Sequence, residues 1–252
     1  MIELRDVCKR YGQRLVVDHV SVTFREGRVT SIIGPNGAGK STLLSVASRL
    51  IPKDGGEVLV DGREIGRWET QALARRLAVL RQSATVSLRL TVRDLVGFGR
   101  FPHSGGRLTE RDREPIERAL RWMELEPLQD RYLDQLSGGE RQRALLAMVM
   151  AQETDYILLD EPLNNLDIRH AVQIMRRIRR MADEMGKTIV LVLHDLNFAA
   201  AYSDEIVAMK AGRVVQTGTA SEVIRPDVLH EVYDMPIQTV PLQGRQVCVY
   251  FW

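Results

Sequence analysis

Two kinds of hydrophobic pattern alternate along the chain and predict two kinds of β-structure. The apolar-rich runs at Val29–Ile33, 156–159 and 189–193 do not alternate with polar residues, which is typical of strands covered on both faces of a parallel sheet. Residues 1–30 and 57–62 predict short strands separated by turn-forming dipeptides, the pattern of a small antiparallel sheet. We therefore expect a mostly parallel sheet accompanied by an antiparallel one.

Helical patterns occupy much of the rest of the chain. Residues 91–152 show helical periodicity with breakers near Pro102 and no comparable buried strand, so we expect an inserted helical lobe there. In 172–185 apolar residues recur every three to four positions beside the basic run 176–180. This predicts an amphipathic helix with a solvated basic face rather than a nucleic-acid site.

These patterns predict an α/β chain organised as one domain. The core is expected in residues 1–90 and 153–220, the helical part in 91–152, and a C-terminal extension in 221–252. The extension mixes a short helix with a strand-like tail, and we assign it no chemistry.

Composition narrows the classes of function. The 252 residues include 35 Lys and Arg against 33 Asp and Glu, a formal net charge of +2, so no broad basic surface for nucleic acid is expected. Cys8 and Cys248 lie at opposite ends without a Cys/His cluster, which indicates neither a zinc site nor a disulfide framework and suits a reducing cytosol. The N-terminus lacks the pattern of a signal peptide, and the apolar runs are far shorter than the roughly 20 residues that span a bilayer. We expect any membrane role to come through a partner.

A phosphate-binding loop is the clearest local motif. Residues 34–41 match Gly-x4-Gly-Lys-Ser/Thr between the strand Val29–Ile33 and a helical run at 42–50, the setting that this motif requires. Its glycines let backbone N–H groups point at β- and γ-phosphates, and the helix N-terminus adds a favourable dipole. Lys40 supplies a cation to the phosphates, and Ser41 offers a hydroxyl to Mg²⁺. The alternative is an ordinary glycine-rich turn.

Two carboxylates end the strand at 156–159. Asp160 and Glu161 would lie at the carboxyl edge, where open α/β sheets bind ligands. Asp160 can hold a metal, directly or through water, and Glu161 is placed to polarise an attacking water in phosphoryl transfer. Alternatively, this pair caps the next turn.

The segment Leu136-Ser137-Gly138-Gly139-Glu140 lies within the helical part and precedes the carboxylate pair by about twenty residues. Ser137 and the glycines expose amides at the start of a helix. Here the sequence resembles the ATP-binding-cassette (ABC) ATPases, whose signature motif Leu-Ser-Gly-Gly-Gln/Glu it reproduces. In isolation, the same residues also form an ordinary helix cap.

The resemblance extends over almost the whole chain, with six motifs in the family order. It implies a P-loop NTPase cassette with a RecA-like, mostly parallel core, an N-terminal antiparallel β-subdomain and an inserted α-helical subdomain. It assigns catalysis to Glu161 and His194, metal binding to Ser41, Gln82 and Asp160, and adenine stacking to Tyr11. The nucleotide-binding residues it implies are Tyr11, Gly34, Pro35, Asn36, Gly37, Ala38, Gly39, Lys40, Ser41, Thr42, Gln82, Ser137, Gly138, Gly139, Glu140 and Asp167. The family pattern is altered only at Arg81 and Leu163, which touch no residue assigned to phosphate chemistry.

The resemblance also implies a mechanism and partners. Two copies sandwich ATP and Mg²⁺ head to tail, and they drive a separate integral-membrane permease fed by a substrate-binding protein. The chain would then lie peripherally on the cytoplasmic face of the cell membrane. The segments at 91–103, 160–168 and 194–204 look closest to iron-siderophore importers, with haem or cobalamin import as alternatives. A non-transport ABC ATPase acting on nucleic acid or ribosomes is the rival class, but it is disfavoured by the single cassette and the absence of cysteine pairs.

Overall fold

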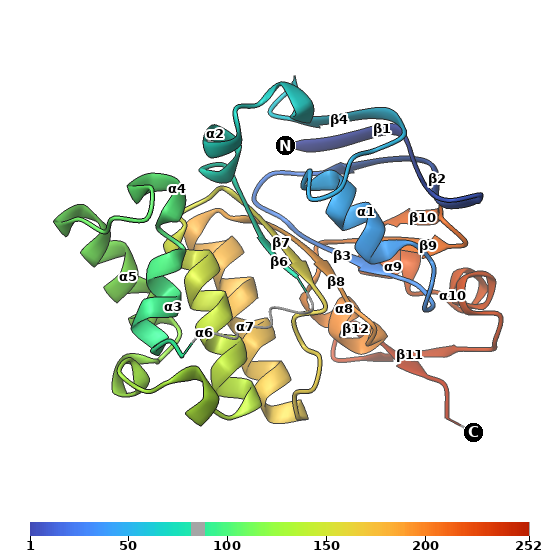
Figure 1. Ribbon diagram of the computed structural model, residues 1–252. Coiled ribbons are helices and arrows are strands. Elements are labelled where there is room, and N and C mark those ends of the chain that lie inside the picture. The colour runs from blue at the N-terminus through green and yellow to red at the C-terminus, as the bar shows by residue number, and fades with distance from the viewer. Residues whose placement is uncertain (82–88, 252) are drawn as a thin grey trace. The chain divides into compact units, whose positions relative to one another are not determined.

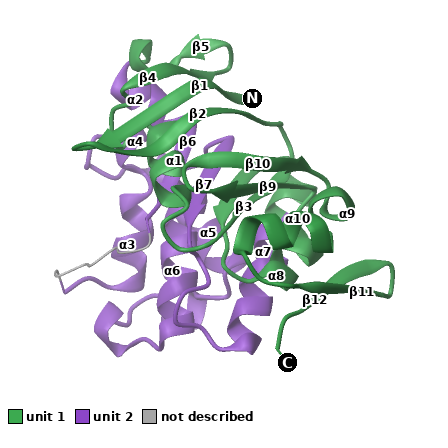
Figure 2. Cartoon of the chain, turned by 90° about the vertical axis from the view of Figure 1, so that its right-hand side faces the viewer, with its two compact units in different colours: residues 1–68, 181–252 green, residues 69–180 purple. Residues whose placement is uncertain are grey.

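The computed structural model describes residues 1–81 and 89–251 and divides the chain into two compact units. Unit 1 comprises Met1–Trp68 and Met181–Trp252, and unit 2 comprises Glu69–Arg180 (Figure 2). Each unit contains both strands and helices (Figure 1).

An antiparallel sheet forms the first part of unit 1. Its strands run in the order β2 (Arg14–Phe24), β1 (Ile2–Tyr11), β4 (Gly55–Val60) and β5 (Arg63–Glu64). As predicted, an Asp-Gly turn closes the strand in 57–62. β4 ends at Val60, and Asp61 and Gly62 both have positive φ, 52° and 74°, as a tight turn between paired strands requires.

A second set of strands in unit 1 is mostly parallel. The order is β10 (Arg213–Gly218), β9 (Glu205–Lys210), β3 (Val29–Ile33) and β8 (Thr188–Val192), with β3 parallel to both β8 and β9. Every residue of β3 and β8 is buried. The structure confirms the two-sided burial expected from their apolar runs.

Short helices and a C-terminal hairpin complete unit 1. The helices are α1 (Lys40–Ala47), η1 (Ile65–Arg67), α8 (Leu196–Tyr202), α9 (Ala220–Val223) and α10 (Pro226–Tyr233). Strands β11 (Gln238–Leu242) and β12 (Arg245–Val249) pair into the hairpin. A helix and a strand-like tail therefore follow residue 221, as predicted.

Unit 2 is largely helical. It contains α2 (Thr70–Ala74), α3 (Val92–Phe98), α4 (Phe101–Ser104), α5 (Glu110–Trp122), η2 (Glu126–Leu128), η3 (Leu133–Gln135), α6 (Gly138–Ala151) and α7 (Ile168–Met185), whose last five residues belong to unit 1. Helices α3, α5 and α6 pack against one another (Figure 1). Among the described residues of this unit, the strands β6 (Leu77–Leu80) and β7 (Tyr156–Asp160) pair in parallel. The helices predicted within 91–152 lie in this unit, while the functional subdomain boundaries stay a prediction.

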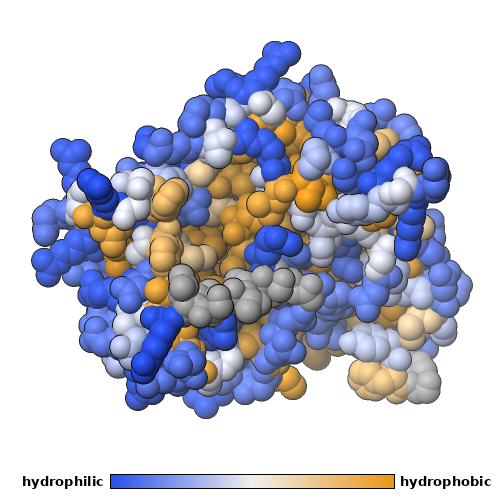
Figure 3. Space-filling model, in the orientation of Figure 1, coloured by the Kyte–Doolittle hydropathy of each residue, from blue (hydrophilic) through white to orange (hydrophobic). Residues whose placement is uncertain are grey.

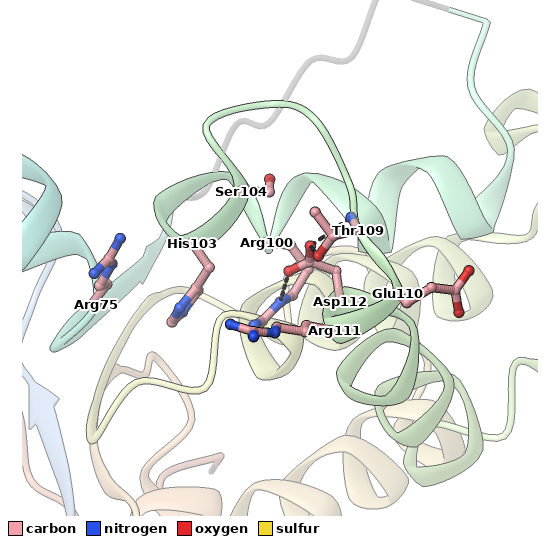
Figure 4. A pocket seen from close by; sticks show the side chains of 8 residues that line it. All are labelled: Arg75, Arg100, His103, Ser104, Thr109, Glu110, Arg111 and Asp112. Carbon is pink, nitrogen blue, oxygen red and sulfur yellow. Dashed lines mark hydrogen bonds and ion pairs between the residues drawn. The ribbon is translucent and has the colours of Figure 1, made fainter.

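A buried ion pair stabilises the helices of unit 2 (Figure 4). Arg100 Nε donates to Asp112 Oδ1 at 3.0 Å, with side chains only 6% and 5% exposed. Arg100 Nη1 also donates to the carbonyl of Ala151 and to Glu153, each at 2.7 Å. Asp112 accepts further bonds from the backbone N–H and the hydroxyl of Thr109. The pair thus joins the segment after α3 to the start of α5.

No helix in the described part of the chain is both long enough and apolar enough to cross a membrane.

Candidate functional site

The phosphate loop of unit 1 requires glycine at two closely packed positions. Gly34 and Gly39 have φ of 147° and 97°, a region that residues with a Cβ rarely adopt. A Cβ at Gly34 would overlap the carbonyl oxygen of Met209, and one at Gly39 would overlap that of Val16. Neighbouring backbone therefore holds the loop in a conformation that only glycine permits.

Lys40 is the first residue of α1 and its side chain is directed back into the loop. The residue is 5% exposed, and Nζ donates to the carbonyls of Gly34 at 2.8 Å and Pro35 at 3.0 Å. No side chain caps the N-terminus of α1, whose first N–H groups have no partner within the helix. A buried cation beside an uncapped helix start fits a phosphate group.

His194 follows β8 at the same edge of unit 1 as the phosphate loop. Parallel pairing places Ile32 opposite Val192, and Leu193 N–H donates to the Ile32 carbonyl at 3.1 Å. Because parallel strands end at a common edge, the segments that begin at Gly34 and His194 leave the sheet side by side. His194 is exposed there.

The C-terminal hairpin is hydrogen-bonded to α8, the helix that begins two residues after His194. The sequence did not indicate this contact. Asp195 caps α8 by accepting from the N–H groups of Asn197 and Phe198. Asn197 then pairs with the Cys248 backbone, accepting its N–H at 2.7 Å and donating to its carbonyl at 3.3 Å. Burial raises the pKa of the Cys248 thiol to about 11, with a contribution from Asp195. Asn197 is thus a candidate positioning residue, and no local pattern links it to a partner 51 residues away.

Tyr11 ends β1 in unit 1 and is 53% exposed. Lys9 Nζ lies 5.8 Å from the ring centroid, within the range of a cation–π contact. An accessible aromatic face of this kind can stack on a nucleobase.

The two candidate carboxylates end β7 in unit 2. Asp160 is buried at the last position of this fully buried strand. Glu161 adopts φ of 50°, which is uncommon for a residue with a Cβ and is typical of functional segments. Asn164 Nδ2 donates to Glu161 Oε2 at 2.6 Å. Asn164 therefore orients this carboxylate, a role that the sequence did not reveal.

The signature segment of unit 2 forms a capping box at the start of α6. Ser137 Oγ accepts from the Glu140 N–H at 3.3 Å, and Glu140 Oε2 accepts from the Ser137 N–H at 2.8 Å. The Ser137 N–H, followed by the Ser137 hydroxyl, lowers the pKa of Glu140 below its ordinary value. The helix-cap interpretation is confirmed. Gly138 and Gly139 lie in the first turn of α6, where Gly138 is exposed and Gly139 is buried.

Asp167 lies just before α7 and is bound to the helix start. Its Oδ1 accepts from the N–H and from Nδ1 of His170, both at 2.8 Å. The His170 backbone N–H is the largest cause that lowers the pKa of Asp167.

The candidate residues are divided between the two units. Unit 1 brings together the phosphate loop and the segment of His194, and it also contains Tyr11. Unit 2 contains Asp160, Glu161, the signature segment and Asp167. Gln82 lies outside the described residues.

Comparisons with known proteins agree with this arrangement of motifs. The ABC transporter family model matches residues 17–164. The petrobactin import ATP-binding protein YclP of Bacillus subtilis (strain 168) is 55% identical over 251 residues, covering 100% of both chains. FatE of Bacillus anthracis, also a petrobactin import ATP-binding protein, is 45% identical and covers 99% of this chain and 100% of its own length. The dimeric structure of MJ0796, a bacterial ABC transporter cassette, aligns with a TM-score of 0.78 and 30% identity over 87% of this chain and 99% of that one. Because both the family model and the relatives span most of the sequence, the chain belongs to the ABC transporter family.

Proposed function

We propose that this chain is the ATP-binding and ATP-hydrolysing subunit of an ABC importer that energises uptake of an iron-siderophore complex. The observation that carries the cargo class is the 55% identity, over the full length of both chains, to a petrobactin import ATP-binding protein. The loop around Lys40, with its uncapped helix start, supports the ATPase activity.

Each part of the nucleotide has a candidate partner. The exposed ring of Tyr11 stacks on the base, while Lys40 and the N–H groups at the start of α1 bind the β- and γ-phosphates. Ser41 offers a hydroxyl and Asp160 a carboxylate, the hard oxygen ligands that suit Mg²⁺. When bound, Mg²⁺ neutralises charge on the phosphates. Gln82 is proposed as a further ligand from the family resemblance.

Hydrolysis requires an oriented water and a group that attracts its proton. Glu161, oriented by Asn164, polarises the water, and His194 bonds the γ-phosphate from the edge of unit 1. The dimer of the related cassette MJ0796 supports a shared site, in which Ser137, Gly138, Gly139 and Glu140 of one copy face the nucleotide on the other. ATP then favours the closed dimer because ADP lacks the γ-phosphate contact.

An apolar groove in unit 2 is the proposed permease contact. A cavity of about 230 Å³ is lined by Phe98, Phe101, Leu108 and other residues of this unit. Phe98 and Phe101 are 50% and 60% exposed, and Figure 3 shows apolar surface over the helices at the left of the view. Exposed apolar patches on otherwise polar surfaces mark protein contacts. Through this contact the chain would sit peripherally on the cytoplasmic face of the membrane and respond indirectly to a substrate-binding protein.

The decisive experiment reconstitutes the chain in liposomes with the permease encoded beside it. Ferric petrobactin with its binding protein is expected to stimulate ATP hydrolysis, and Lys40→Ala is expected to abolish both basal and stimulated rates because the γ-phosphate loses its cation. Phosphate release is measured with each cargo in turn.

The outcomes separate the candidate cargoes. A response to haem or cobalamin, without one to ferric petrobactin, would keep the ATPase activity and correct the cargo. Equal rates for the Lys40→Ala protein and the unaltered chain would contradict the assigned nucleotide site.

A second prediction concerns the groove. Phe101→Ser is expected to leave the basal ATPase rate within twofold and to remove most of the cargo stimulation, because a buried aromatic contact contributes on the order of 2–4 kcal/mol to a protein interface. Leu242→Ser, which alters a residue of the hairpin that is also 60% exposed, is the control and should retain stimulation. Co-purification with the permease provides the second readout, and full stimulation by Phe101→Ser would place the contact elsewhere.

A further inference from the structure

His170 lies between two of the motif segments in unit 2. It belongs to the first turn of α7, and its side chain is 32% exposed. The Nδ1 side of the ring faces Asp167 Oδ1 at 2.8 Å. The opposite side of the ring packs against Gly139, the second residue of α6.

The contact with Gly139 is close enough to exclude any side chain there. A Cβ built on Gly139 would lie 2.5 Å from Cδ2 of His170 and 2.7 Å from Cγ, well inside van der Waals distance. The ring therefore fills the space that the missing side chain leaves. The signature segment and the segment before α7 also lie close together at Gly138, where an added Cβ would be 3.8 Å from the carbonyl oxygen of Asn165.

The two ring contacts differ in kind. The contact with Asp167 is directional, because one carboxylate oxygen accepts from both the backbone N–H and Nδ1 of the same residue. The contact with Gly139 is steric and limits how closely the start of α6 can approach α7. A shift of either segment would thus be transmitted to the other through one imidazole ring.

We propose that His170 is a positioning residue that fixes the Asp167 segment and the signature segment relative to each other. This inference rests on the proposed function, in which both segments face the nucleotide site of a second copy. In this role His170 acts through the two segments that it contacts. Its contribution is to the geometry of the shared site, where small misplacements lower rates strongly.

If His170 has this role, its replacement should lower the rate of ATP turnover and leave ATP binding nearly unchanged. His170→Ala is expected to lower kcat for ATP hydrolysis about tenfold or more. Binding of ATP to the dilute, monomeric protein should change less than twofold, because the phosphate loop belongs to unit 1. His170→Asn should restore at least half of the lost rate, because its Nδ2 can donate to Asp167 as Nδ1 does.

A double-substitution cycle tests the ring contact directly. Gly139→Ala places a methyl group against the ring, so its effect on kcat should be smaller in the His170→Ala background than in the unaltered chain. Arg176→Ala, at an exposed position of the same helix, is the control and should leave kcat unchanged. Thermal melting of each variant separates a change in turnover from a loss of folded protein.

The outcomes distinguish this inference from the proposed function. If the unaltered chain does not hydrolyse ATP, the proposed function fails. If it does, and His170→Ala retains full kcat or the two substitutions have strictly additive effects, the positioning role is overturned. If His170→Ala does not fold, His170→Asn takes its place in the cycle with Gly139→Ala. Strictly additive effects of these two substitutions on kcat would then overturn the positioning role.

Discussion

Replacing Glu161 with Gln is expected to leave ATP binding intact and to lower the rate of hydrolysis by about 10²- to 10⁴-fold, the range associated with a general base. Gln keeps the length of the side chain and an oxygen that can accept from Asn164, which donates to Oε2 at 2.6 Å. It lacks the negative charge that attracts a proton from water. The substitution should therefore slow the chemical step of hydrolysis without affecting folding.

The same variant is expected to accumulate as an ATP-bound dimer. Hydrolysis is what removes the γ-phosphate contact, so a protein that binds ATP without cleaving it remains in the closed state. Size-exclusion chromatography with ATP and Mg²⁺, together with single-turnover phosphate release, measures both properties. Glu110→Gln, an exposed position in the first turn of α5, is the matched control. Unchanged hydrolysis, or a nucleotide-bound monomer, would contradict the shared-site mechanism.

Replacing Asp112 with Ala is expected to lower the free energy of unfolding by about 3 kcal/mol, because one member of a buried ion pair is removed. Arg100, whose side chain is 6% exposed, would keep Glu153 and the Ala151 carbonyl but lose its partner at 3.0 Å. The change also deletes the Asp112 bonds to the N–H and hydroxyl of Thr109 at the start of α5.

Urea unfolding compares this variant with Glu114→Ala on the same helix. Glu114 is paired with Arg118 at the surface and is 64% exposed, so its loss should cost less than about 1 kcal/mol. Equal losses of unfolding free energy in the two variants would contradict the prediction that the buried ion pair stabilises the fold more than the exposed one.

The pH dependence of the Asp112 effect has a definite sign. Burial raises the pKa of Asp112, but hydrogen bonds from Thr109 and Arg100 outweigh burial and hold it below its ordinary value. The carboxylate therefore stabilises the fold above the unfolded-state pKa of about 3.9. Its contribution is lost as the pH falls through the lower folded-state value. The stability difference between Asp112→Ala and the unaltered chain should narrow only in this acidic range.

Local patterns predicted most of the elements that carry the motifs. The apolar runs at Val29–Ile33 and 156–159 are buried strands. A strand that is covered on both faces has an uninterrupted apolar sequence, which can be recognised without knowing its neighbours. The phosphate loop could also be predicted from the sequence, since its backbone conformation requires glycine at fixed positions. The predicted helix at 42–50 ends earlier, at Ala47, and Arg49 has φ of 61°.

Side-chain partners distant in sequence could not be predicted in this way. His170 contacts Gly139, and Asn197 contacts Cys248, at sequence separations of 31 and 51 residues. Neither pair leaves a periodic signal, because each contact depends on how separate elements pack and not on local conformation. Asn164 beside Glu161 is close in sequence, yet its role depends on the turn that Glu161 makes with φ of 50°.

The sequence by itself located the motifs to which this protein's chemistry is assigned, because phosphate-binding loops and helix starts depend on residue types at fixed short spacings. Lys40 after its glycines, the carboxylates at the end of β7 and the signature segment at the start of α6 are all of this kind. The tertiary structure alone decided what holds these residues in place. Backbone oxygens of Met209 and Val16 confine the loop, Asn164 orients Glu161, and the ring of His170 separates two segments. Such contacts arise only when distant parts of the chain pack together, since packing and not spacing selects which side chains meet.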